Sequence, residues 1–465
     1  MAAGRIQGGA MSSPESTTRR DFLKSVGAVG AVVAAAGVSA TADSPPQSAP
    51  TTGVAGLVAP PLATVRFGLV GVGARGSSHI DELLKVDGCE VTALCDPHGP
   101  ALAAGLSKLT QAGRRPPAAF GDGPDAYRRL LERNDVDAVV LSTPWELHVP
   151  HAVEALRAGK HVFVEVPAAV TLDECWQLVD TAEATRRHCM MLENVCYGRE
   201  ELLVLHMCRQ QLFGELLHAE AAYLHDLRFQ EKEIDWGTGS WRVPYYERRN
   251  GNVYPTHGLG PVAQYLGINR GDLFSHLVSM SSPARGYALY AAREFPPDHP
   301  RNRARYVLGD MNTSLVQTAR GRTIVVQHDV ATPRPYSRHN LVSGTRGAFG
   351  GFPNRIAVEG RTDVHRWDTD MARWFAEFDH PLWRRVGGEA EKMGGHGGMD
   401  YVMWWRTVQC LREGLALDQD VYDAASWSAV GPLSEQSVAQ GGAPVKVPDF
   451  TRGRWKDTPA LGIVS

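Results

Sequence analysis

Apolar runs of strand length alternate with amphipathic, helix-like stretches over the first half of the chain. The runs occupy residues 64–70, 90–96, 137–143, 161–165 and 188–194. Thr171 and Glu174 have capping-box spacing and predict the start of a helix that extends to about residue 187. Strands that alternate with helices predict a doubly wound parallel sheet, which binds ligands beyond the carboxyl ends of its strands.

The first apolar run leads directly into the spacing G-x-G-x-x-G, formed by Gly71, Gly73 and Gly76. In a dinucleotide-binding unit the first glycine permits a tight turn and the second lets the backbone approach a pyrophosphate. The third lets the helix pack close to the strand. Asp96 ends the next strand, where a carboxylate accepts hydrogen bonds from ribose hydroxyls and repels a 2′-phosphate. The pattern therefore predicts a Rossmann domain that binds NAD rather than NADP.

Polar side chains also stand at the ends of the later strands. Because these ends meet at one edge of a parallel sheet, we expect them around the same cofactor. They are Trp145 to His148, Glu165, Glu193 and Asn194. Taken singly, each has a structural alternative, since His148 can simply begin a helix and Trp145 can simply pack.

The residues before the first strand indicate export. Arg19 and Arg20 precede Asp-Phe-Leu-Lys and an Ala/Gly/Val-rich stretch that is too short to span a membrane, and Ala40-Thr-Ala42 is typical of a cleavage site. We expect a twin-arginine signal peptide over residues 1–42 and a linker over residues 43–63, with a periplasmic or secreted product. An exported enzyme has no dinucleotide pool, so it should carry and regenerate its NAD.

Length, charge and residue spacing indicate the number of domains and exclude several classes of partner. The chain has 465 residues, a net charge of −3 and seven cysteines without C-x-x-C spacing. We expect an NAD-binding domain over residues 64–192 and a substrate domain over residues 193–465. No basic run points to nucleic acid, no span points to a membrane once the signal is removed, and no histidine spacing points to a metal site.

Two motifs in the first domain are similar to those of a known superfamily. The Thr143-Pro-Trp-Glu-Leu-His148 loop and the Gly159-Lys-His-Val162 strand resemble the glucose–fructose oxidoreductase and inositol dehydrogenase superfamily. Most members have Glu-Lys-Pro after that strand, with the lysine serving redox chemistry at a hydroxyl. This chain has Glu165-Val166-Pro167, which weakens a plain dehydrogenase interpretation.

The second half resembles glycoside hydrolase family 109, above all in Tyr254-Pro-Thr-His257-Gly258 and in His396-Gly-Gly-Met-Asp400. The resemblance implies an α/β protein in which a C-terminal α+β domain with an open, mainly antiparallel sheet follows the Rossmann domain. It also implies hydrolysis of terminal α-N-acetylgalactosamine residues with retention. The implied route is NAD-dependent oxidation, elimination, addition and reduction on tightly held NAD.

Site residues follow from the same resemblance. The residues that it places near NAD, beside the glycines, are Ala74, Arg75, Asp96, Trp145, His148, Glu165, Val166 and Asn194. Those near the sugar are Tyr223, Arg242, Tyr254, His257 and Tyr336, with Tyr197 adjoining both. His257, Tyr254 and Tyr197 are the candidates for proton transfer, with Arg242 available to assist a tyrosine.

Two other functions remain open at this point. One is an exported sugar oxidoreductase that couples two sugars on bound NAD, against which the missing lysine counts. The other is a non-enzymatic sugar or dinucleotide sensor, because fold alone does not give function. The expected partner is a small glycoside or a glycan terminus, and the open sheet is compatible with a homo-oligomer.

Overall fold

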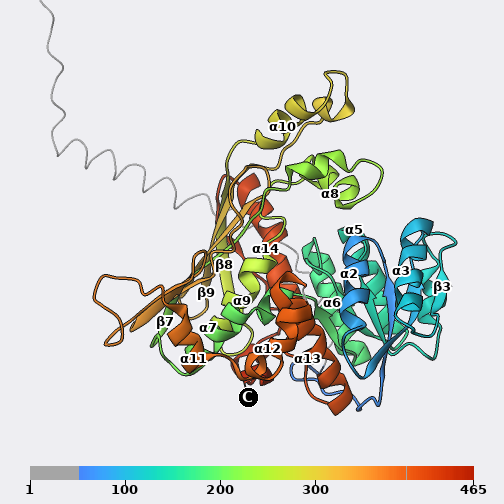
Figure 1. Ribbon diagram of the computed structural model, residues 1–465. Helices are drawn as coiled ribbons and strands as arrows, with labels where there is room; N and C mark the ends of the chain where they lie inside the picture. The colour runs from blue at the N-terminus through green and yellow to red at the C-terminus, as the bar shows by residue number, and fades with distance from the viewer. Residues whose placement is uncertain (1–51, 394, 465) are drawn as a thin grey trace, which may run out of the picture. The chain divides into compact units, whose positions relative to one another are not determined.

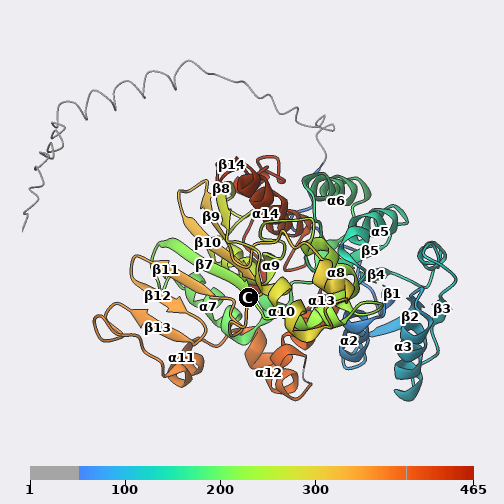
Figure 2. The same cartoon turned by 90° about the horizontal axis from the view of Figure 1, so that it is seen from above.

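The computed structural model describes residues 52–393 and 395–464 (Figure 1). The predicted signal peptide and residues 43–51 of the predicted linker lie outside the described residues. Within the described part, one sheet belongs to the N-terminal half and a second sheet to the C-terminal half (Figure 2).

The first sheet confirms the predicted Rossmann domain. Its six strands pair in the order β3-β2-β1-β4-β5-β6, and all of them are parallel. The strands are β1 (Val65–Val70), β2 (Cys89–Cys95), β3 (Ala118–Phe120), β4 (Ala138–Leu141), β5 (His161–Val164) and β6 (Cys189–Met191). The helices are α2 (Ala74–Leu83), α3 (Gly99–Gln111), α4 (Tyr127–Leu131), α5 (Trp145–Arg157) and α6 (Leu172–Thr185). The capping box of Thr171 and Glu174 opens α6 as predicted.

The second sheet has eight strands in the order β13-β12-β11-β7-β10-β9-β8-β14, and only the pair β7–β10 is parallel. This confirms the mainly antiparallel sheet. The strands are β7 (Leu216–Leu224), β8 (Phe274–Ser281), β9 (Asn312–Thr318), β10 (Thr323–Asp329), β11 (Leu341–Gly344), β12 (Gly347–Gly350), β13 (Arg355–Val358) and β14 (Val445–Lys446).

Helices of the second half cover its sheet and also return to the first sheet. They are α7 (Arg199–Arg209), α8 (Thr238–Tyr246), α9 (Thr256–Leu266), α10 (Gly286–Glu294), α11 (Met371–Phe378), α12 (Pro381–Met393), α13 (Met399–Glu413) and α14 (Val421–Ala439). Figure 1 shows α13 and α14 between the two sheets. On α13, Trp404 packs edge-on against Phe67 of β1 and Phe163 of β5, with centroids 5.5 and 5.9 Å away. The two halves thus share one core.

Residues 52–63 correct part of the predicted linker. Val54 is buried and its backbone N–H donates to the Tyr422 hydroxyl over 3.0 Å, while the Leu62 N–H donates to the Leu411 carbonyl over 3.1 Å. The Pro- and Ala-rich composition predicts a linker, but a few apolar side chains of this segment, such as Val54, pack against the folded domains. None of the described helices is long and apolar enough to cross a membrane.

Candidate functional site

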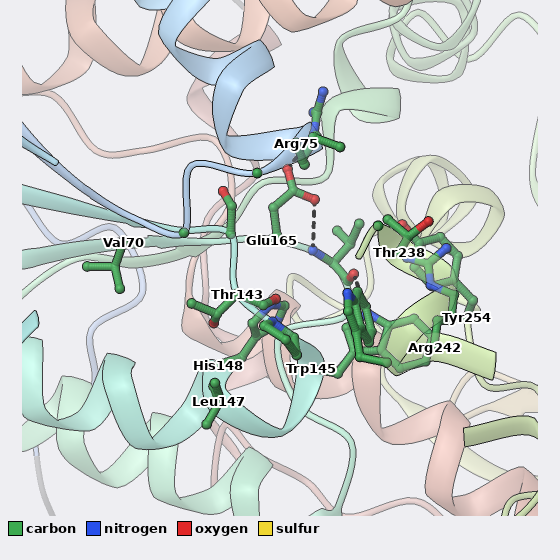
Figure 3. Close-up of a pocket in the computed structure, with 18 of the residues that line it drawn as sticks. Val70, Arg75, Thr143, Trp145, Leu147, His148, Glu165, Thr238, Arg242 and Tyr254 are labelled. Atoms are coloured by element: carbon green, nitrogen blue, oxygen red, sulfur yellow. Dashed lines mark hydrogen bonds and ion pairs between the residues drawn. The ribbon is translucent and has the colours of Figure 1, made fainter. Parts of the chain in front are cut away.

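A cavity of about 780 Å³ lies at the carboxyl ends of the Rossmann strands and is lined by both halves of the chain. Figure 3 shows residues from β1, from the loop after β4 and from α8 around it. It lies where the strand order reverses between β1 and β4, which is where open α/β sheets bind ligands. The cavity is therefore the candidate active site.

The glycine-rich turn at one end of the cavity fits a dinucleotide. Gly71 has φ +84°, and a Cβ atom there would lie 2.7 Å from the Ser142 carbonyl oxygen. A Cβ at Gly76 would lie 2.0 Å from the Gly71 carbonyl oxygen, so only glycine permits the close packing of α2. No side chain caps α2 and no acidic residue lies in its first turn, which leaves the helix N-terminus open to an anion.

Asp96 lies in the cavity lining beyond β2, as predicted for a ribose ligand. The backbone N–H groups of Val72 and His98 each donate to its carboxylate over 2.8 Å, which fixes the side chain while leaving acceptor capacity. Three buried oxygens near the same crevice have no partner within the described residues, namely Ser142 Oγ, Thr143 Oγ1 and Asn194 Oδ1. These orphaned polar atoms and the glycine cradle fit the polar groups of bound NAD.

Trp145, His148 and Val166 connect the loops after β4 and β5. The Trp145 indole N–H donates to the Val166 carbonyl over 3.2 Å, and the two His148 nitrogens lie 2.9 Å from the carbonyl oxygens of Pro167 and Thr143. Burial lowers the pKa of His148. All three residues line the cavity as predicted, and His148 holds the loops in place.

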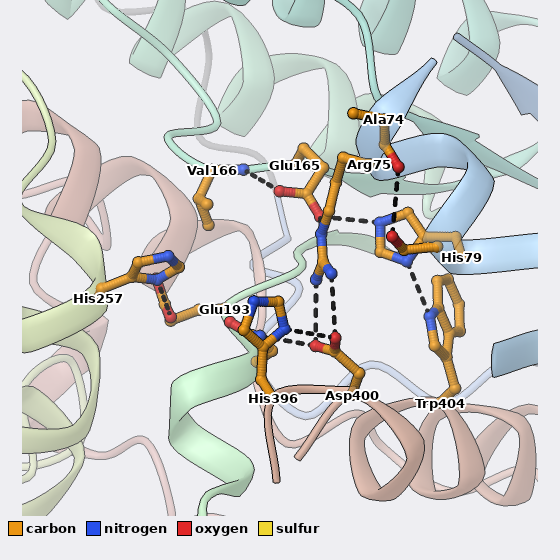
Figure 4. A network of polar contacts seen from close by, with 12 residues as sticks. Ala74, Arg75, His79, Glu165, Val166, Glu193, His257, His396, Asp400 and Trp404 are labelled. Atoms are coloured by element: carbon orange, nitrogen blue, oxygen red, sulfur yellow. Dashed lines mark hydrogen bonds and ion pairs between the residues drawn. The ribbon is translucent and has the colours of Figure 1, made fainter. Parts of the chain in front are cut away.

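Arg75 and Glu165 belong to an ion-pair network beside the cavity (Figure 4). Arg75 donates from Nε to Glu165 over 2.7 Å and from its two terminal nitrogens to Asp400 over 3.0 and 3.1 Å. Burial opposes ionisation of Glu165, but Arg75 and His79 hold its pKa well below the usual range. Its ion pair with Arg75 therefore favours the charged carboxylate and does not suit Glu165 to act as a proton donor.

Asp400 joins this network to two residues at the cavity. Asn194 Nδ2 donates to Asp400 over 2.6 Å, and His396 Nδ1 lies 2.7 Å from the same carboxylate. The His396 side chain is 64% exposed and lines the cavity. An imidazole that is oriented by a buried carboxylate thus faces the opening.

The other end of the cavity is lined by aromatic rings from the second half. Tyr223, at the end of β7, lies 4.6 Å from Tyr254 and 5.5 Å from His257 between centroids. Tyr254 also stacks on Trp145 of the Rossmann half at 5.8 Å. Tyr336 stands further out, 6.3 Å from Tyr223. The structure therefore brings together the predicted sugar residues beside the cofactor crevice.

His257 is held by a buried carboxylate. Its Nδ1 lies 2.7 Å from Oε1 of Glu193, and its Nε2 lies 3.4 Å from the Tyr254 hydroxyl. Because the carboxylate accepts the Nδ1 proton, Nε2 is the acceptor toward the cavity. Burial raises the pKa of Tyr254 well above its usual value, and nearby Arg242 acts in the opposite direction.

Gly258 explains how α9 brings His257 to this position. A Cβ atom at Gly258 would lie 2.3 Å from the Ala222 nitrogen and 2.5 Å from its carbonyl oxygen. Only glycine lets the first turn of α9 lie directly on β7, which sets His257 beside Tyr223.

Arg242 comes from α8 and lies among aromatic rings. Its guanidinium carbon lies 4.8 Å from the Trp145 ring centroid and 5.2 Å from that of Tyr254. Among the described residues no carboxylate lies within ion-pair distance of it. The charge thus lies beside Tyr254, the tyrosine that it is expected to assist.

Two predicted site residues do not line the cavity: Gly76, which packs α2 against the glycine turn, and Tyr197. Tyr197 is buried, and its hydroxyl lies 3.4 Å from Asp418, which is paired with Arg406. The buried ion pair of Asp418 and Arg406 supplies the polar partner of the tyrosine outside the cavity lining. The prediction that Tyr197 transfers a proton is wrong.

Several further residues line the cavity, among them His225, Trp236, Arg338 and His396, and no catalytic or binding role is predicted for them from the sequence. His225 Nδ1 lies 2.8 Å from the Tyr223 hydroxyl. For His396 the available sequence indication is its place in the His396-Gly-Gly-Met-Asp400 motif.

The comparisons with known proteins agree with this site. Residues 65–193 match the family described as "Oxidoreductase family, NAD-binding Rossmann fold", and residues 197–457 match "Glycosyl hydrolase 109, C-terminal domain". With the cradle and Asp96, the first match establishes NAD as the cofactor.

Similar proteins extend over nearly the whole chain. An alpha-N-acetylgalactosaminidase of Shewanella oneidensis is 56% identical over 452 residues, which cover 96% of this chain and 98% of that protein. A glycosyl hydrolase family 109 protein of Shewanella sp. W3-18-1 is 57% identical over 453 residues, with the same coverage.

Solved structures share the fold at low identity. A levoglucosan dehydrogenase in complex with NADH and levoglucosan has a TM-score of 0.61 and 18% identity, and covers 83% of this chain and 100% of its own. The WlbA dehydrogenase of Bordetella pertussis has a TM-score of 0.60 and 18% identity, and covers 84% of this chain and 100% of its own. The family matches and the close relatives show that this chain belongs to glycosyl hydrolase family 109.

Proposed function

We propose that the protein releases terminal α-N-acetylgalactosamine from glycosides with retention, through redox chemistry on a recycled NAD. One observation carries the proposal: the cofactor crevice and the His257–Tyr254 couple share one cavity. The name of the Shewanella oneidensis relative supports the choice of sugar.

The carboxylates argue against ordinary hydrolysis. Most glycosidases place two carboxyl groups on either side of the scissile bond. Among the described residues that line the cavity, the carboxylates are Asp96 and Glu165, both in the Rossmann half. Asp96 stands at the ribose position and Glu165 is ion-paired with Arg75, so neither is free to act on a glycosidic oxygen.

When bound, NAD supplies a hydride acceptor and donor for sugar C3. The residues of the chain move the protons. His257 Nε2 is oriented by Glu193 as a base, and Tyr254, beside Arg242, lies within reach of the same proton. These two groups are suited to remove protons from the C3 hydroxyl and from C2.

His396 is suited to the leaving group. Elimination from C1 expels an alkoxide, which an acid must protonate when the alcohol is a poor leaving group. The imidazole of His396, fixed by Asp400, stands at the open part of the cavity.

Export by the twin-arginine route is part of the proposal. It rests on Arg19-Arg20 and on the Ala40-Thr-Ala42 motif. Replacement of both arginines by lysine should retain the protein in the cytoplasm, as cell fractionation would report. Unchanged export of this variant would contradict the proposed route.

A direct assay tests the activity. Purified protein is incubated with nitrophenyl α-N-acetylgalactosaminide without added NAD, and the first-formed anomer is followed by NMR. Release of nitrophenol with the α-anomer formed first supports the proposal. Net oxidation without release would instead favour a sugar oxidoreductase.

A further inference from the structure

We propose that Phe352, together with Tyr336 and Arg338, forms a subsite for the second sugar of the substrate, a neutral hexopyranose that carries the terminal residue. The inference rests on the proposed function and specifies the chemical class of the aglycone. Tyr336 and Arg338 lie in the segment before β11, and Phe352 lies in the turn after β12.

A continuous row of rings leads from the cofactor crevice to this subsite. Centroids are separated by 5.8 Å between Trp145 and Tyr254, 4.6 Å between Tyr254 and Tyr223, 6.3 Å between Tyr223 and Tyr336, and 5.9 Å between Tyr336 and Phe352. Exposure rises along the row from 2% at Trp145 to 40% at both Tyr336 and Phe352. A sugar held at the inner rings therefore has the outer rings beside its aglycone.

The topology of the sheet places Phe352 at the same edge as the site. Strand β11 is antiparallel to both β7 and β12, so β7 and β12 run in the same direction. Their carboxyl ends meet at one edge, where β7 delivers Tyr223 and β12 leads into the turn with Phe352. Tyr336 and Arg338 precede β11 at that edge.

The backbone of Phe352 has φ +53°, in the left-handed region that bulky residues rarely adopt. The side chain is 40% exposed, so burial of the ring offsets only part of the cost of this conformation. Local strain of this kind is concentrated at binding sites.

Arg338 completes the subsite. Its guanidinium carbon lies 4.9 Å from the Phe352 centroid and 5.6 Å from that of Tyr336. The buried carboxylate of Glu201 accepts a hydrogen bond from Arg338 Nη2 over 2.7 Å and fixes the plane of the guanidinium group. Aromatic faces pack against the C–H face of a pyranose, and guanidinium N–H groups donate to hydroxyls. This combination of exposed rings and a charge-paired guanidinium suits a neutral sugar.

Binding of a matched pair of ligands tests the subsite. Titration calorimetry compares N-acetyl-α-galactosaminyl-(1→3)-galactose with methyl α-N-acetylgalactosaminide on NAD-loaded protein that also carries His257→Ala, so that neither substrate is consumed during the titration. Phe352→Asn removes the ring, and asparagine tolerates a positive φ. We expect this variant to bind the disaccharide about three- to tenfold more weakly and the methyl glycoside unchanged.

Two further variants serve as controls. Phe352→Tyr should keep the preference for the disaccharide, and Leu289→Asn, at an exposed apolar position on α10, should change neither affinity. Equal losses for both ligands, or no loss for either, would overturn the subsite. Failure of the wild-type protein to cleave the methyl glycoside would reject the proposed function, while the affinity difference would still report on Phe352.

Discussion

The indole of Trp236 stacks on the imidazole of His98, with ring centroids 3.6 Å apart and ring planes inclined by 19°. His98 caps the N-terminus of α3, two residues after Asp96, whereas Trp236 precedes α8 in the second half. Trp236 also lies over the glycine turn, since a Cβ atom at Gly73 would be 3.4 Å from its ring. The stack therefore bridges the two halves across the cofactor crevice.

Trp236→Ala should weaken the retention of NAD. An aromatic pair contributes about 0.5–1.5 kcal/mol beyond its buried area, which corresponds to a roughly two- to tenfold change in Kd. The measurement is the NAD content of the purified protein after dialysis, together with the Kd for NAD. An unchanged content would show that the stack joins the halves without holding the cofactor.

Asp96→Ala provides the reference for that effect. Its carboxylate–ribose hydrogen bonds are charge-assisted and worth roughly 1.5–3 kcal/mol, or about one to two decades in affinity. The NAD content should fall further than in Trp236→Ala, while circular dichroism stays native. Stoichiometric NAD after dialysis would remove Asp96 as the ribose ligand.

His257→Ala and Tyr254→Phe should each reduce turnover by about 10²–10⁴-fold, because both groups are placed for proton transfer. Glu193→Gln should also reduce turnover, since an amide does not hold the His257 Nδ1 proton as a carboxylate does. NAD content is measured in each variant. Turnover like that of the wild type with NAD still bound would exclude these residues from the mechanism.

The parts of the site that could be predicted from the sequence are those encoded by neighbouring residues. The glycine turn and Asp96 belong to one βαβ unit, where each residue type answers a local requirement for φ, close packing or charge. The resemblance then supplied Tyr254, His257 and Arg242, because their motifs are contiguous.

The remaining parts arise from packing over long distances in the chain. Arg75 and Asp400 are 325 residues apart in sequence, and only the return of α13 to β1 brings them together. No periodicity marks His396 or Trp236 as cavity residues. The position of Tyr197 cannot be predicted from its own motif, because its hydrogen-bond partner Asp418 is 221 residues away in the sequence.

Asp400→Asn should destabilise the fold and flatten its dependence on pH. Breaking a buried ion pair costs about 3–5 kcal/mol. Burial opposes ionisation of Asp400, but His396 and Arg75 hold its pKa well below the usual range. The stabilisation is thus complete above the unfolded pKa of about 4 and is lost as pH falls below it.

Urea unfolding with NAD present, at pH 7 and below pH 4, measures both effects. The wild-type protein should lose more stability on acidification than the variant. Glu377→Gln, which breaks an exposed pair with Arg361, is the matched control and should leave stability within error. A variant as stable as the wild type at pH 7 would contradict a structural role for the Asp400 pair.

His396→Gln should reduce the turnover of different substrates to different extents, according to how readily the leaving group departs. A nitrophenolate departs without a proton, so the nitrophenyl glycoside should retain most of its turnover. A methyl glycoside needs the proton and should lose about 10²–10⁴-fold. Equal losses for the two substrates would assign His396 to an earlier step or to structure.

Isotopes test the chemistry itself. If a base removes the C2 proton, reaction in D₂O places deuterium at C2 of the released sugar. Deuterium at C3 of the substrate should slow cleavage and yet remain at C3 in the product, because the hydride is returned to the carbon from which it came. Direct displacement by carboxylates predicts neither deuterium at C2 nor slower cleavage of the C3-deuterated substrate.

His257→Ala sharpens this test, because loss of a base for C2 should suppress deuterium uptake and cleavage together. The nitrophenyl glycoside is used at high concentration so that residual turnover yields enough product for NMR. If His257 serves the C3 hydroxyl instead, the C3 isotope effect should change while each product molecule still acquires deuterium at C2. Full retention of the C2 hydrogen by the wild-type protein in D₂O, with no isotope effect at C3, would reject elimination in favour of ordinary hydrolysis.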